Sequence, residues 1–90
     1  MKINDREYVI PELNFNAMCR LEEMGASFTD MDKKVLSTVR AFLALAMGGD
    51  IEEAGMEIEK HIASGGGFDE MMKDISRAVE ESGFFQALKA

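Results

Sequence analysis

The chain has 90 residues, of which 47 % are hydrophobic and 30 % are charged, and its formal net charge is −7. This length fits one domain with a small core, and the hydrophobic fraction argues against disorder. The negative charge disfavours binding to nucleic acid and to anionic membrane surfaces, because both need a basic protein surface. We therefore expect a single acidic globular domain.

Cysteine content and hydropathy indicate the cellular compartment in which the protein is found. The one cysteine, Cys19, excludes an intramolecular disulfide and a multi-cysteine zinc site, which is typical of a reducing environment. The N-terminal residues do not have the pattern of a signal peptide, and the apolar run Ala41–Met47 is too short to cross a bilayer. We expect a cytosolic protein.

Residues 1–10 predict a short β-hairpin. Ile3 and the apolar residues 8–10 flank Asn4 and Asp5, two residue types that tolerate the left-handed conformations of tight turns. Pro11 then ends strand pairing, because proline lacks an amide hydrogen. Such a small hairpin is marginal alone, so it should pack on the helices.

The rest of the chain predicts a mainly α domain of four to five helices. Asn14 is a good N-cap for the first helix, and Gly25 suits the position just after its end. The second helix has four competing caps, at Ser27, Thr29, Asp30 and Asp32, and ends before two glycines. The expected helices span residues 15–24, 33–47, 51–64, 69–82 and 84–89.

The second helix is the most informative segment, because Ala41–Met47 is entirely apolar. A helix that is apolar around most of its circumference must be covered on more than one side. It is therefore either the buried centre of the fold or a surface that awaits another protein. The run Ala41–Met47 contains no catalytic residue type.

The third helix begins with Asp50 and Glu53, which resemble a capping box. Gly55 lies in the middle of its apolar stripe and costs about 1 kcal/mol relative to alanine, which favours close approach of a neighbouring helix. The three glycines at 65–67 predict a helix stop and a hinge. They lack the preceding strand and the Lys-Ser/Thr ending of a phosphate loop.

Few residues suggest chemistry. Glu57 and His61 are four apart on one helical face, but two ligands make an incomplete metal site, and a surface histidine near a helix C-terminus is the favoured interpretation. Cys19 lacks a supporting base and is expected in the core. The acidic runs have no EF-hand pattern and are interpreted as solvated helix faces. We expect no enzyme, no metal and no cofactor.

Two adjacent apolar pairs, Met71-Met72 and Phe84-Phe85, predict a protein-binding surface. Adjacent helical residues do not face one core together, so at least one of each pair should be exposed or lie at an interface. Methionine adapts to varied partners. The predicted partner-binding residues are Phe84, Phe85, Leu88, Met71, Met72, Phe42 and Leu45.

Several segments resemble one family across nearly the whole chain: residues 36–50, Glu57–Glu59 with His61-Ile62, Gly65-Gly66, residues 81–85, and residues 8–13. They are similar to the short tail assembly chaperones of long-tailed phages and prophages in Gram-positive bacteria.

The resemblance implies a non-enzymatic helper of tail morphogenesis. Members of that family bind the long, aggregation-prone tape measure protein, keep it soluble, help to recruit tail tube subunits, and are absent from the mature virion. In several phages a programmed frameshift gives a longer form, and this chain would be the short one. The implied location is the host bacterial cytoplasm. Apart from the resemblance, the exposed apolar pairs and the nearly all-apolar second helix indicate self-association into a homo-oligomer.

The alternative function is a minor structural tail or connector protein of the virion. For the chaperone, the sequence predicts that replacing Phe84 and Phe85 by aspartate abolishes solubilisation of the co-expressed client and leaves the fold largely intact.

Overall fold

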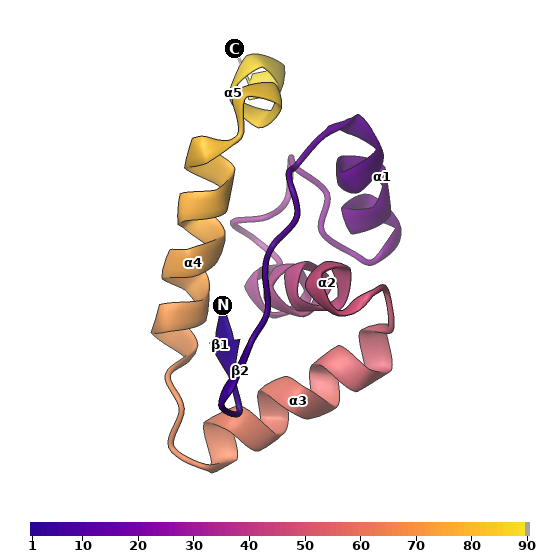
Figure 1. The fold of residues 1–90 in the computed structure, drawn as a ribbon. Helices are drawn as coiled ribbons and strands as arrows, with labels where there is room; N and C mark the ends of the chain where they lie inside the picture. The colour runs from indigo at the N-terminus through magenta and orange to yellow at the C-terminus, as the bar shows by residue number, and fades with distance from the viewer. Residues whose placement is uncertain (90) are drawn as a thin grey trace.

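The computed structural model describes residues 1–89 and has the predicted class, mainly α with a short N-terminal hairpin (Figure 1). Within these residues, no helix has the length and hydropathy that a bilayer span requires. The elements in chain order are β1 (Lys2–Ile3), β2 (Arg6–Glu7), α1 (Phe15–Glu23), α2 (Val35–Met47), α3 (Ile51–Ala63), α4 (Phe68–Glu81) and α5 (Gly83–Lys89).

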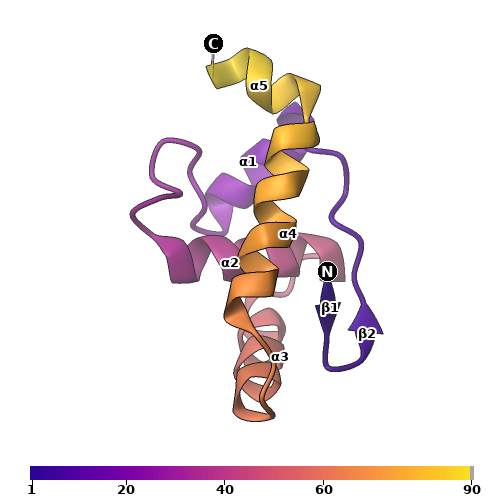
Figure 2. The same ribbon diagram turned by 90° about the vertical axis from the view of Figure 1, so that its left-hand side faces the viewer.

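Helix α2 is the centre of the fold. Figure 1 shows it nearly end-on, with α1, α3 and α4 around it, and Figure 2 shows it passing behind α4. Of the two interpretations of its apolar sequence, the structure supports the buried centre, because residues 41–45 are all buried. Its buried residues are Thr38, Val39, Ala41, Phe42, Leu43, Ala44 and Leu45.

The outer helices each bury one stripe against α2. Helix α1 buries Ala17, Met18 and Leu21, and this orientation turns Cys19 to the solvent. The prediction that Cys19 lies in the core was therefore wrong. Helix α3 buries only Ala54 fully, so most of its surface is partly or fully exposed.

Gly55 on α3 faces a neighbour, as its position in the stripe predicted. A Cβ atom at Gly55 would lie 3.4 Å from Cδ of Arg40, which belongs to α2. The atom that approaches Gly55 is therefore in a side chain rather than in the backbone of the neighbouring helix.

The sequence located most helix ends. The Asn14 side chain accepts a hydrogen bond from the Ala17 amide at 2.9 Å, and Asp50 accepts one from the Glu53 amide at 3.0 Å. Gly25 adopts the left-handed conformation, with φ of +99°, just after α1. These caps fix the ends of α1 and the start of α3 as predicted.

The start of α2 differs from the prediction. The helix begins at Val35, and Lys34 precedes it without any side-chain capping bond. None of the four expected caps is used, because residues 27–34 form turns of their own; in one of them the Asp30 carbonyl accepts the amides of Lys33 and Lys34, each at 3.0 Å.

The hairpin is shorter than predicted, but its turn is where the sequence placed it. Lys2 pairs with Glu7 and Ile3 with Arg6, and Met1 and Tyr8 exchange two backbone hydrogen bonds of 2.7 Å, so pairing reaches Tyr8 but not Val9 and Ile10. Asn4 and Asp5 have φ of 51° and 65°. Two consecutive positive φ values are the signature of a type I′ turn.

Asn4 fastens the hairpin to α3. Its side-chain amide donates to the Glu57 carboxylate at 2.8 Å and to the Glu57 carbonyl oxygen at 2.9 Å, and its backbone amide donates to Nδ1 of His61 at 3.1 Å. His61 lies in the last turn of α3, as predicted, and is half-buried there. Glu57 and His61 hold the hairpin in place.

The Asn4 contacts lead to a stability prediction. We expect Asn4→Ala to lower the free energy of unfolding by about 1–3 kcal/mol more than Asp5→Ala does, because it removes two side-chain hydrogen bonds. The matched control also puts alanine at positive φ, but the Asp5 side chain makes no hydrogen bond within residues 1–89 that the substitution would remove. Urea unfolding followed by circular dichroism measures both, and equal losses would contradict the proposed role of Asn4.

Candidate protein-binding site

An apolar groove of about 640 Å³ lies between α4 and the chain from Phe28 to Val39. We call it the α4 groove. Its deepest lining comes from three separate elements, through the buried side chains of Val39 on α2, Ile75 on α4 and Phe85 on α5. The groove is therefore a product of the tertiary fold and not of one amphipathic segment.

The walls of the α4 groove carry exposed apolar side chains. Phe28, 41 % exposed, and Met31 stand on the side of the turn segment, and Met72, 37 % exposed, stands on α4. Val35 and Val79 extend these walls. Exposed large apolar residues gathered around one hollow are typical of a protein-binding surface.

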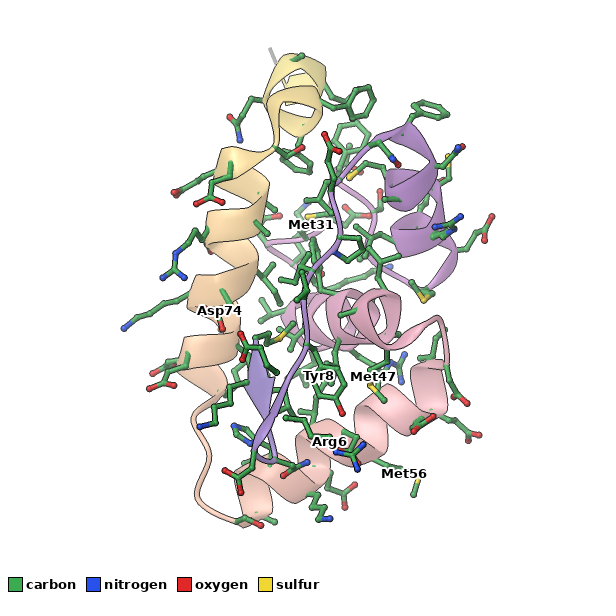
Figure 3. All side chains as sticks on the ribbon, in the orientation of Figure 1. Arg6, Tyr8, Met31, Met47, Met56 and Asp74 are labelled. Atoms are coloured by element: carbon green, nitrogen blue, oxygen red, sulfur yellow. The ribbon has the colours of Figure 1, made fainter. Side chains whose placement is uncertain are left out.

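Of the methionines that solvent reaches, Met31 belongs to the α4 groove and Met56 does not. Met31 lines the α4 groove from the turn segment, whereas Met56 projects from α3 into solvent (Figure 3). Met56 is 71 % exposed and does not line the groove. It is a natural control position for experiments on the groove.

The charged residues that line the α4 groove are acidic. They are Asp32 on the turn segment and Glu80 on α4, and both are exposed. In the part of the chain that the structure describes, neither forms an ion pair. The groove therefore combines an apolar interior with uncompensated negative charge on two of its sides.

Ser82 positions the α5 end of the groove. Its buried hydroxyl donates to the Leu13 carbonyl at 3.1 Å and accepts from the Phe85 amide at 3.0 Å. One side chain thus caps α5 and ties it to the chain that precedes α1. This arrangement directs Phe85 inward, where it is only 3 % exposed.

The seven predicted partner-binding residues divide among three places. Phe42, Leu45 and Met71 are buried and do not reach the surface. Met72 and Phe85 line the α4 groove. The prediction that one member of each adjacent pair is exposed is confirmed, since solvent reaches Met72 and Phe84 but not Met71 and Phe85.

Phe84 and Leu88 lie outside the groove. The ring of Phe84 packs against Phe15 at the start of α1, with centroids 6.0 Å apart and planes at 83°, an edge-to-face arrangement. Leu88 is also exposed on α5. Phe15, Phe84 and Leu88, which follows Phe84 by one helical turn, are all exposed apolar residues, and we call them the aromatic end.

The burial of Phe85 corrects the expectation for the double aspartate variant. Phe85→Asp would place a carboxylate in the core, and an unpaired buried charge is strongly unfavourable. Loss of binding in that variant would report unfolding, so exposed wall residues are the proper targets.

The sequence did not predict most of the residues that form the groove wall. They are Phe28, Met31, Val35 and Val79. A signal was present, because Phe28 and Met31 are large apolar residues in an otherwise polar turn segment. Large apolar residues in a polar turn need an apolar neighbour, and here that neighbour is α4.

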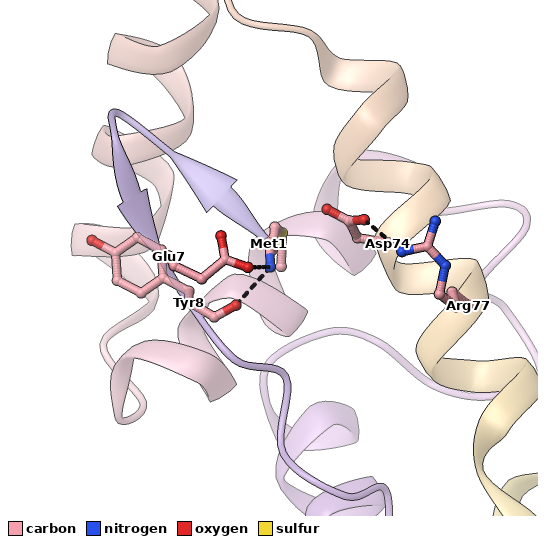
Figure 4. Close-up of polar contacts among 5 residues, drawn as sticks. All are labelled: Met1, Glu7, Tyr8, Asp74 and Arg77. Carbon is pink, nitrogen blue, oxygen red and sulfur yellow. Dashed lines mark hydrogen bonds and ion pairs between the residues drawn. The ribbon is translucent and has the colours of Figure 1, made fainter.

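A second, more open cleft of about 330 Å³ lies between the hairpin and α4. Charged groups dominate it: Asp74 pairs with Arg77 at 3.4 Å, and the Met1 amino group donates to the Tyr8 carbonyl at 2.7 Å and lies 3.4 Å from the Glu7 carboxylate (Figure 4). Because several of its polar groups already pair with one another, this cleft is a weaker candidate for an apolar ligand.

Metal-ligating residues do not gather anywhere in residues 1–89: no three of the types His, Cys, Asp and Glu are placed to hold an ion together. Comparisons of the chain with protein-family models, with curated proteins and with solved structures found no match.

Proposed function

We propose that this chain is a phage tail assembly chaperone that binds the tape measure protein and keeps it soluble during tail morphogenesis. The observation that carries the proposal is the α4 groove, an open apolar surface on a chain whose core is already filled by α2. The resemblance of residues 36–50 and 81–85 to that family names the client.

The groove suits a long helical client. An amphipathic helix binds by laying its apolar face in a hydrophobic groove, and methionines on the walls adapt to different side chains along the client. The net charge of −7 would keep a chaperone–client complex soluble. No chemical step is required, and we assign no catalytic residue.

The proposed site of action is the cytoplasm of the host bacterium, with the chain released before the virion is complete. The tail tube protein is the second proposed partner. The alternative role, a minor structural tail or connector protein, places the chain in purified particles at fixed stoichiometry, where mass spectrometry of virions would find it.

The chaperone role predicts the effect of a wall substitution. Co-expressed with the tape measure protein, the Met72→Asp variant should lose most of the client-solubilising activity, because it puts a carboxylate on the apolar wall of the groove. Met56→Asp, a matched change at an exposed helical methionine outside the groove, should leave the soluble client fraction unchanged. Solubility of the client is measured after centrifugation of the lysate.

Thermal unfolding of both variants checks that the fold survives, since both positions are exposed. A tape measure protein that stays insoluble even with the unaltered chain would contradict the proposed function.

A further inference from the structure

We infer that the occupant of the α4 groove is a single amphipathic α-helix with lysine or arginine flanking its apolar stripe. This inference deepens the proposed function, on which it rests for the identity of the client, by defining the kind of segment that the groove recognises. It follows from three properties of the groove: its backbone surroundings, its length and its charge.

The backbone surroundings favour a helix over an extended peptide. An extended segment must find hydrogen-bond partners for its own amides and carbonyls, and it usually finds them at a sheet edge. Among residues 1–89 the strands are β1 and β2, and neither lines the groove. A helix satisfies its backbone internally and needs only an apolar surface.

The length of the groove sets the length of the occupant. Helix α4 has 14 residues and forms one wall from Met72 to Glu80. At 1.5 Å per residue, the nine residues from Met72 to Glu80 span about 13 Å, so about two and a half turns of a client helix would lie along the groove.

The charge of the groove selects a cationic flank. Asp32 and Glu80 come from the two walls, and neither has an ion pair among the described residues. A helix that seats its apolar stripe between the walls brings its flanking residues toward these carboxylates, where lysine or arginine gains attraction and glutamate is repelled. A second copy of this chain also has a net charge of −7, which disfavours it as the occupant.

The test uses two synthetic peptides of about 18 residues with the same leucine stripe at helical spacing, one flanked by lysine and one by glutamate. Fluorescence anisotropy with the full chain at low salt measures binding. The lysine peptide should bind at least about tenfold more tightly than the glutamate peptide, and it should gain helical circular dichroism on binding. Equal affinity, or binding without helix formation, would overturn the inference.

Two variant pairs locate the binding. Met72→Asp should weaken binding of the lysine peptide at least about tenfold, whereas Met56→Asp should not change it. The double variant Asp32→Asn/Glu80→Gln should weaken binding roughly two- to fivefold more than Glu52→Gln/Glu59→Gln, which removes the same charge from the exposed face of α3. Equal losses within either pair would show non-specific attraction to an acidic protein and would overturn the assignment.

Sedimentation velocity tests the remaining possible occupant of the groove, which is a second copy of this chain. A concentration-dependent dimer that Met72→Asp dissolves would show that a second copy fills the groove, and it would overturn the inference. If the peptides bind as predicted but the tape measure protein stays insoluble, the assignment of the groove is supported and the proposed function is refuted. A client that Met72→Asp still solubilises refutes the groove and leaves the function standing.

Discussion

The constraint on which this structure depends is the burial of residues 41–45 of α2 on all sides. Because these five residues carry no polar side chain, they need cover from several directions, and in a chain of 90 residues that cover takes α1, α3 and α4 together. Each outer helix therefore packs against the centre with one stripe only. The hairpin is held at the edge by the contacts of Asn4 with Glu57 and His61.

The same constraint leaves the α4 groove open. Helix α4 turns Met71 and Ile75 toward the core, which leaves Met72 on its adjacent edge beside the turn segment before α2. No further helix remains to cover this edge in the described chain, and α5 reaches only one part of the groove, through Phe85 and Gln86. The core residues Val39, Ile75 and Phe85 thus form the floor of an apolar hollow with acidic sides, and this hollow is the physical basis for proposing a binding protein.

The sequence predicted those features that depend on local chemistry. Asn14, Gly25 and Asp50 mark helix ends by hydrogen bonds or backbone angles within a few residues, and Asn4-Asp5 mark the turn in the same way. It did not predict features that depend on tertiary placement. The orientation of α1 decides that Cys19 is exposed, and the Ser82 bond to Leu13, across 69 residues of sequence, decides that Phe85 is buried. The groove also brings Phe28 close to α4, and no local sequence pattern predicts a contact between segments so far apart in the chain.

The methionine methyl groups offer the most direct test of the central claim, that the surplus apolar surface is the α4 groove and that a client helix fills it. Methyl-labelled methionine gives separate NMR signals for groove, core and outer-surface positions, and these signals are followed as a soluble helical segment of the client is added. The account predicts that the Met31 and Met72 signals shift while Met56 does not. A shift at Met56 with Met31 and Met72 unchanged would contradict it.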